Sequence, residues 1–199
     1  TVPSGYTGIY TTTNFGSVRS GGRGTNGSSA KYILMEDITV TSIDTTAWSG
    51  SDGNPWKGEL DGNGHTITLS GTAEGEYYDN GGLFSVIGGG AYIHDLTVQV
   101  GNVRVNNNAG NANFGTIAGA ASGNATIDNV YISLNKDSSS NNDTYLSSQG
   151  TSWLGGVLGK LDTSGTVEIK NTTVYNSAEG SNGFSATINK ENGVYVGGF

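Results

Sequence analysis

A short strand pattern recurs along the chain and constrains its fold more than any other feature. Residues 56–67 read W-K-G-E-L-D-G-N-G-H-T-I, and a related pattern follows at residues 81–96. In both, Gly and Asn interrupt short runs in which apolar and polar residues alternate. Gly and Asn enter left-handed backbone at little steric cost, so they favour sharp turns between strands. The pattern therefore predicts a coiled repeat of β-strands rather than a globular enzyme core.

Apolar residues recur at matching places in successive units. The isoleucines that we align are separated by 29, 26, 34 and 42 residues: Ile38, Ile67, Ile93, Ile127 and Ile169. A repeat of this length is typical of a solenoid, in which each unit buries its apolar face only against its neighbours. We expect these side chains to point inward and to form one aliphatic ladder, with strands about 4.8 Å apart.

Additional strands and loops complete each unit. A second apolar strand precedes several of the aligned positions, at residues 83–87, 114–117 and 154–158, and residues 194–199 begin a further unit. The variable spacing places polar loop insertions at residues 101–113, 135–152 and 177–183. Helical periodicity is confined to a short stretch near residues 13–19.

The composition favours a long, narrow core. Gly accounts for 34 of 199 residues, and only 34% of the chain is hydrophobic. So little apolar material cannot fill a sphere of this size.

The formal charge is −8, and the 9 basic residues form no cluster, which argues against nucleic acid as a partner. No apolar run reaches the length of a membrane span, so no membrane insertion is expected. The absence of Cys excludes disulfides and thiolate metal sites.

Several motifs resemble those of a known group of domains. The matching segments are YILMEDI at 32–38, GELDGNGHTI at 58–67, GLF at 82–84, WLGGVLG at 153–159 and VGGF at 196–199. Together they resemble the GLUG-repeat and filamentous-haemagglutinin-like parallel β-helix domains of bacterial surface proteins. Leu60 stands where that family usually has Phe. The resemblance covers most of the chain and implies a fold more than a function, because the family includes adhesins, surface-layer-like proteins and accessory domains of secreted proteases.

These observations predict an all-β fold, a right-handed parallel β-helix (solenoid) of about five to six coils with loop insertions. We expect a single domain over residues 1–199. Residues 1–31 form an N-terminal cap segment, and residues 32–199 form coils that are cut off before further repeats. The uncovered end predicts continuation into further repeats, or head-to-tail self-association.

The expected function is that of a non-catalytic module in the extracellular space or at the cell surface, which acts as a stalk, a fibre unit or an adhesin. Its partner would be a host glycan or a protein receptor. The alternatives are a polysaccharide-acting β-helix enzyme and an accessory domain of a large secreted peptidase. The chain has no H-E-x-x-H motif, so peptidase chemistry would lie elsewhere.

Exposed aromatic rings are the candidates for contact with a carbohydrate or another partner, because such rings stack on sugars. The candidates are Trp48, Trp56, Tyr77, Tyr78, Tyr145 and Trp153. The alternative interpretation is that these rings cap the coils or fill the corners of the interior.

Three carboxylates are the candidates for an enzyme site. Asp61, Asp95 and Asp128 fall in or near corresponding strands, and glycoside hydrolysis needs a carboxyl pair about 5 to 9.5 Å apart. The alignment on isoleucine puts Asp95 and Asp128 on different faces, and the strands offer only Lys170 as a base. The sequence therefore predicts no catalytic residues.

Metal sites and corner residues are the remaining polar features. His65 and His94 are the only histidines, and we expect each to face solvent or a turn, without a third ligand at a fixed spacing. The run from Asp61 to Gly64 offers oxygen ligands to Ca²⁺, but it lacks the full calcium-loop pattern and is interpreted as a structural turn. No cofactor is expected. Asn129 and Asn171 occupy equivalent places and should stack in a corner of the coil.

Overall fold

The computed structural model describes residues 1–45, 54–75, 80–134, 144–148, 150–161, 165–176, 184–186 and 194–197. In these ranges the chain consists mainly of strands, with one α-helix and one 3-10 helix between the first strand and the second. The elements are β1 (Thr7–Ile9), α1 (Thr12–Arg23), η1 (Gly27–Ser29), β2 (Lys31–Leu34), β3 (Ile38–Val40), β4 (Glu59–Asp61), β5 (Thr66–Gly75), β6 (Asn80–Gly81), β7 (Phe84–Gly88), β8 (Ala91–Asn107), β9 (Ala112–Gly115), β10 (Ala118–Ser122), β11 (Ala125–Leu134), β12 (Thr144–Ser148), β13 (Ser152–Gly155), β14 (Leu158–Leu161), β15 (Val167–Lys170), β16 (Thr173–Asn176), β17 (Phe184–Ala186) and β18 (Val194–Gly197).

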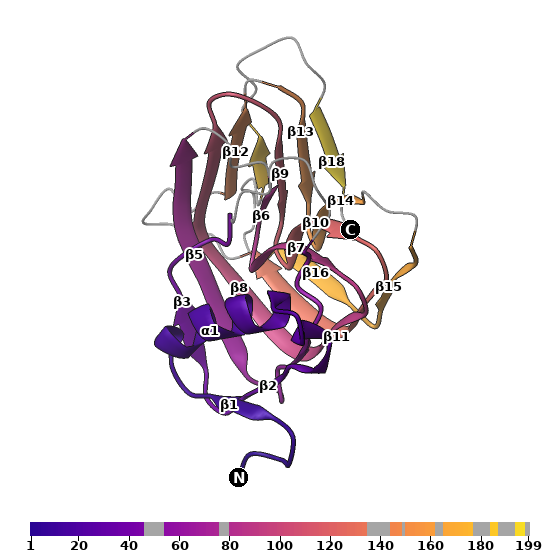
Figure 1. The fold of residues 1–199 in the computed structure, drawn as a ribbon. Coiled ribbons are helices and arrows are strands. Elements are labelled where there is room, and N and C mark those ends of the chain that lie inside the picture. Colours follow the sequence, from indigo (N-terminus) through magenta and orange to yellow (C-terminus); the bar gives the residue numbers. More distant parts are fainter. Residues whose placement is uncertain are drawn as a thin grey trace.

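The strands form three sheets of parallel strands that stack successive turns of the chain. One sheet has 11 strands, the second has the order β14-β10-β7, and the third has the order β18-β13-β9-β6. A representative turn runs along β8 in the large sheet, then β9 in the third sheet and β10 in the second, and returns to the large sheet as β11. Figure 1 shows the resulting stack of strands. The coarser part of the fold prediction is confirmed: the described chain is mostly β, and its parallel sheets are stacked as in a solenoid.

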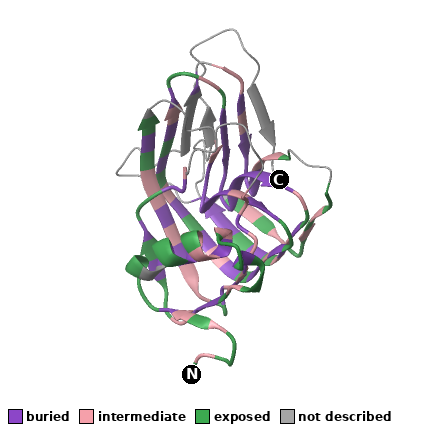
Figure 2. Ribbon diagram, in the orientation of Figure 1, coloured by how far each residue is buried: buried purple, intermediate pink, exposed green. Residues whose placement is uncertain are grey.

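The apolar residues form two ladders in the large sheet, not the single ladder predicted from the isoleucines. In one ladder, the cross-strand partners are Tyr32, Leu60, Ile93, Ile127 and Ile169. In the other, they are Ile38, Ile67, Val98, Ile132 and Val174. The single-ladder alignment is wrong because each turn carries an inward apolar residue on both sides of a bend. Figure 2 shows the buried stripe that both ladders contribute to the interior.

The bend between the two ladders has left-handed backbone at residues other than glycine. Asp95, Asn129 and Asn171 have φ values of 51°, 53° and 49° and occupy one corner in successive turns. The Asn129 side-chain amide donates to Asp95 Oδ1 at 2.5 Å, and that of Asn171 donates to Asp128 Oδ1 at 2.8 Å. Asn and Asp are the residues that tolerate this conformation best, apart from Gly. Asn129 and Asn171 occupy equivalent corner positions as predicted, but each amide donates to a carboxylate of the preceding turn rather than to the other amide.

Helix α1 covers the apolar interior at one end of the stack (Figure 1). Phe15 and Val18 lie one helical turn apart on its buried face, and the Phe15 ring packs 5.9 Å from that of Phe84. The indole of Trp56 donates to Val18 O at 2.9 Å. The helix is longer than the predicted residues 13–19. It lies within the predicted cap segment, residues 1–31, which also contains β1 of the large sheet, and the cap stays a prediction. In the described part of the chain, no helix has the length and apolarity needed to span a membrane.

Part of the predicted loop at residues 101–113 is a strand instead. β8 continues to Asn107, because Val103 and Val105 alternate with polar residues and point into the core. Residues 144–148 of the second predicted loop also form a strand, β12, which pairs with β8. Residues 135–143 and the third predicted loop, 177–183, lie outside the described residues.

The predicted further unit near the end of the sequence is a strand of the stack. In β18, Val196 and Gly197 pair in register with Leu154 and Gly155 of β13, which in turn pair with Phe114 and Gly115 of β9. The Gly-containing motif thus recurs at the same place in successive turns.

Candidate functional site

A row of polar side chains lies on the face of the large sheet opposite the first ladder. The register pairs Asp61 of β4 with His94 of β8, and His94 with Asp128 of β11. Glu59 lies two residues before Asp61 and shares its side of β4, because side chains alternate along a strand. The fold thus brings acidic residues from neighbouring turns to a single imidazole.

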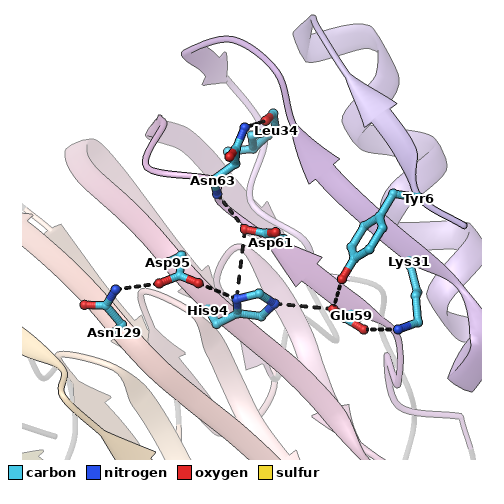
Figure 3. Close-up of polar contacts among 9 residues, drawn as sticks. All are labelled: Tyr6, Lys31, Leu34, Glu59, Asp61, Asn63, His94, Asp95 and Asn129. Carbon is cyan, nitrogen blue, oxygen red and sulfur yellow. Dashed lines mark hydrogen bonds and ion pairs between the residues drawn. The ribbon is translucent and has the colours of Figure 1, made fainter. Parts of the chain in front are cut away.

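His94 is surrounded by carboxylates (Figure 3). Its Nδ1 lies 2.7 Å from Asp95 Oδ2 and 3.9 Å from Asp61 Oδ1. Its Nε2 lies 3.4 Å from Glu59 Oε1. The ring of Tyr92 stacks on the imidazole at a centroid distance of 4.2 Å. These neighbours leave only 8% of His94 exposed. Of the two predicted alternatives, solvent or a turn, the first is wrong and the second holds, because His94 directly precedes the bend at Asp95.

Glu59 contacts the Nε2 side of the imidazole and interacts with two further side chains, Lys31 and Tyr6. The Lys31 ammonium lies 2.8 Å from Glu59 Oε2, and the Tyr6 hydroxyl donates to Oε1. Burial disfavours the Glu59 carboxylate, but hydrogen bonds from Lys31, Tyr6 and His94 outweigh it and lower the pKa. The hydrogen bond to Glu59, followed by burial, raises the pKa of Tyr6 to about 12.

Asp95 accepts hydrogen bonds on both of its oxygens. The His94 imidazole is the main cause of its lowered pKa, and the Asn129 amide adds to the effect. Its positive φ places Asp95 at the bend, where its carboxylate meets His94 of the same turn and Asn129 of the next. The bend that shapes the coil therefore also positions this carboxylate.

An open pocket of about 400 Å³ adjoins the carboxylates. Its lining consists of Asp61, Asn63, Gly64, Asp95, Leu96, Thr97, Asn129 and Tyr131. The backbone N–H of Asn63 donates to Asp61 Oδ1 at 2.7 Å, and Asn63 has a φ of 51°. The run from Asp61 to Gly64 is thus a tight turn that places Asp61 at the edge of the pocket.

The predicted carboxylates divide into two groups. Asp61 and Asp95 both lie beside His94, although the isoleucine alignment did not place them together. Asp128 lies one turn further on, where it contacts Asn171 at 2.8 Å and Lys170 at 3.8 Å. The other histidine, His65, lies apart from this group and contacts Asp37 at 3.2 Å.

Glu59 and His94 were missed as partners of these carboxylates, although the sequence contained a signal. The tripeptides E-L-D at residues 59–61 and Y-I-H at residues 92–94 have the same alternation of polar and apolar residues. Aligning Leu60 with Ile93, as the structure does, would have paired Asp61 directly with His94.

The predicted aromatic contact residues differ in how far they are buried, and some lie outside the described residues. Trp56 is completely buried and its ring stacks 4.3 Å from that of Phe84, so the interior alternative holds for it. Trp153 is half-buried, with Lys160 Nζ 5.4 Å from the ring centroid. Trp48, Tyr77 and Tyr78 lie outside the described residues, and of Tyr145 only the backbone, in β12, is described.

Two exposed tyrosines that the sequence analysis did not select lie beside the pocket. Tyr131 and Tyr175 are 42% and 51% exposed, and their rings are stacked at a centroid distance of 6.3 Å. Tyr131 also lines the pocket. Tyr131 lies one residue before Ile132 of the second ladder and Tyr175 one residue after Val174, so the two tyrosines are diagonal neighbours on the adjacent strands β11 and β16.

Replacing Trp56 by Ala should lower the free energy of unfolding by about 3–5 kcal/mol, because a large aromatic side chain leaves a cavity in a packed core. Chemical denaturation followed by circular dichroism measures the change. A matched Trp153→Ala variant should lose clearly less, since that ring is only half-buried. Equal losses would contradict the interior assignment of Trp56.

The phenol of Tyr6 should titrate near pH 12, whereas an unperturbed tyrosine titrates near 10. The neutral phenol is favoured in the folded state, so its contribution to stability is present below about pH 10 and is lost as the pH rises through 12. Phenolate absorbance of the wild type and a Tyr6→Phe variant measures this step by difference. Glu59→Gln should return the step toward pH 10, and a step that stays at 12 in that variant would contradict the assignment.

The pKa shifts of the carboxyl groups bear on what the site can bind. A glycosidase needs one carboxyl whose pKa is raised so that it can act as a general acid. Among the described residues, every carboxyl with a resolved shift has a lowered pKa: Asp37, Glu59 and Asp95. Ionised carboxylates next to one imidazole favour the binding of a cation or of a polar ligand.

Comparisons with known proteins relate the chain to part of a much longer one. No protein-family model matches the chain, and no solved structure matches it. Halomucin from Haloquadratum walsbyi (strain DSM 16790 / HBSQ001) is 30% identical over 145 residues, which are 68% of this chain and 1% of that protein. The chain thus spans about a hundredth of the length of the curated relative that it matches. The similarity to GLUG-repeat domains stays a prediction.

Proposed function

We propose that the chain is a non-catalytic structural or adhesive module of a large extracellular surface protein. The observation that carries this proposal is the in-register stacking of parallel strands along the large sheet, from β1 to β15. Such a stack buries each turn against the next and forms a stiff unit that presents its loops sideways. In finer terms, we propose a right-handed β-helix of about five to six coils of the GLUG type.

The similarity to Halomucin supports a modular role. A match that covers 68% of this chain but 1% of the relative is what a module within a very long protein would produce.

A surface or extracellular location is part of this proposal, as is continuation of the stack by further repeats or by head-to-tail association. Size-exclusion chromatography with light scattering tests the last point, because a stable monomer with no tendency to associate would contradict it.

The proposed adhesive surface is the tyrosine pair next to the pocket. Exposed aromatic faces stack on sugar rings, and the carboxylates and amides of the pocket offer hydrogen-bond acceptors and donors to hydroxyl groups. A glycan is therefore the proposed ligand, with Tyr131 and Tyr175 as the stacking platform.

A glycan array tests this surface. The wild type should bind at least one class of glycan, and a Tyr131→Ala/Tyr175→Ala variant should lose at least tenfold in affinity for it. Tyr10→Ala is the matched control, because Tyr10 is as exposed as Tyr175 but lies before α1. Binding that is unchanged in the double variant, or equally weakened by Tyr10→Ala, would contradict this part of the proposal.

A polysaccharide-acting enzyme is the second candidate, because the structure brings Asp61 and Asp95 to the same imidazole. Their location on one pocket is the specific observation in its favour, and the lowered pKa of Asp95 argues against that residue as a general acid. We expect no cleavage of pectin-, alginate- or chondroitin-type polymers. Cleavage that Asp61→Asn abolishes while the melting temperature stays unchanged would establish the enzyme instead.

A further inference from the structure

We propose that Asp61, His94 and Asp95 form a binding site for one divalent transition-metal ion, of which Zn²⁺ is the representative. The three residues come from β4 and from β8, the next turn of the stack, so the fold assembles the site across turns. One ligand atom of each lies within 4.8 Å of the others, and this is the group of potential metal ligands that the described residues contain.

The distances around His94 suit one shared ion. Zinc binds imidazole nitrogen and carboxylate oxygen at about 2.0–2.2 Å, so two ligands in a tetrahedral site lie about 3.3 Å apart. Nδ1 of His94 lies 2.7 Å from Asp95 Oδ2 and 3.9 Å from Asp61 Oδ1, on either side of that value. Shifts of about 0.6 Å in the two carboxylates would bring both to the separation that zinc requires.

Glu59 lies where it would orient the imidazole for metal binding. Imidazoles that bind metals commonly donate their second N–H to a carboxylate, which fixes the tautomer and raises the basicity of the ligating nitrogen. A bound ion would replace the proton through which His94 Nδ1 bonds Asp95, and the imidazole would then carry its proton on Nε2, which faces Glu59 Oε1 at 3.4 Å. Glu59 is held in turn by Lys31 and Tyr6, which lie outside the ligand set.

The pocket provides room for the remaining coordination positions. Two of the three ligands, Asp61 and Asp95, form part of its lining, so an ion between them would have an open side toward the 400 Å³ volume. Two carboxylates and a neutral imidazole would carry a charge of −2, which a divalent ion neutralises. The nitrogen ligand favours a transition metal, because Ca²⁺ prefers six to eight oxygen ligands.

Titration with Co²⁺ and Zn²⁺ tests the proposal on the intact chain. Co²⁺ should give visible absorption bands with 1:1 stoichiometry, and Zn²⁺ should displace it with a dissociation constant in the micromolar range or below. His94→Gln and Asp95→Asn should each weaken Zn²⁺ binding at least tenfold in calorimetry. Millimolar Ca²⁺ should not displace Co²⁺.

His65→Gln is the matched control, because His65 also contacts an aspartate but, among the described residues, belongs to no cluster of three potential metal ligands. It should leave Zn²⁺ affinity within twofold. Asp128→Asn, one turn further along the same row, should do the same. Circular dichroism of each metal-free variant checks that the fold is retained, and Asp61→Asn replaces any variant that fails this check.

Three results would overturn the proposal. The first is the absence of 1:1 Co²⁺ or Zn²⁺ binding, in which case His94 serves only as a hydrogen-bonding link between Glu59 and Asp95. The second is an equal loss in His65→Gln, which indicates adventitious binding by the acidic surface. The third is displacement of Co²⁺ by Ca²⁺, which indicates an oxygen-only site. None of these results depends on whether the module binds glycans.

Discussion

Replacing Ile93 by Asp is expected to unfold the protein. Ile93 is completely buried and lies in the first ladder between Leu60 and Ile127 of the neighbouring turns. A carboxylate at this place would be enclosed by aliphatic side chains with no partner, and so would cost more than about 4 kcal/mol. Far-ultraviolet circular dichroism and thermal melting measure the effect, and we expect no cooperative transition.

Gln99→Asp is the control for this prediction, because it adds the same charge to the same strand. Gln99 is exposed, and its partners Thr68 and Ser133 carry no charge. The variant should change the free energy of unfolding by less than about 0.5 kcal/mol, as surface substitutions usually do. Normal melting of Ile93→Asp would show that the first ladder does not form the core.

Replacing Gly115 by Ala should be nearly as damaging as a charge in the core. A Cβ on Gly115 would lie 2.4 Å from Ala118 O and 2.5 Å from Gly159 N, and both are backbone atoms of neighbouring strands. Backbone cannot move aside as a flexible side chain can, so the expected loss is about 3 kcal/mol or more. Denaturant titration measures the loss.

Gly16→Ala is the opposite case and serves as the control. Gly16 lies inside α1, and a Cβ there would meet no atom within 4 Å. Ala has the higher helix propensity, so this variant should be neutral or more stable by up to about 1 kcal/mol. If Gly115→Ala proved as harmless as Gly16→Ala, the close approach of β9, β10 and β14 would be wrong.

The sequence was sufficient to predict the class of fold, because apolar alternation and Gly/Asn turns are local signals. It was insufficient to predict the register. Leu60 and Ile67 flank one bend, and both are apolar residues at the right phase, so either could be aligned with Ile93. The choice depends on which side of the bend each residue occupies, and that is decided by contacts between turns.

The error in register also concealed the candidate site. Pairing Ile67 with Ile93 separates Asp61 from His94, whereas the observed pairing of Leu60 with Ile93 places them side by side. The corner residues were easier to predict, because each one follows its aligned isoleucine by two residues: Asp95, Asn129 and Asn171. The sequence left two interpretations of Trp56 open, an exposed contact residue or an interior one, because its burial depends on how α1 packs on the end of the stack.

Disulfide formation between engineered cysteines tests the stacking of the turns most directly, because the chain has no native Cys. The structure pairs Thr66 with Thr97, whereas the single-ladder alignment would pair Thr66 with Tyr92. Neighbouring strands are about 4.8 Å apart, which is within the Cα separation that a disulfide accepts. After mild oxidation, a Thr66→Cys/Thr97→Cys variant should have no free thiols, and a Thr66→Cys/Tyr92→Cys variant should keep both. The reverse result would contradict the register, and free thiols in both variants would contradict the parallel stacking of β5 on β8.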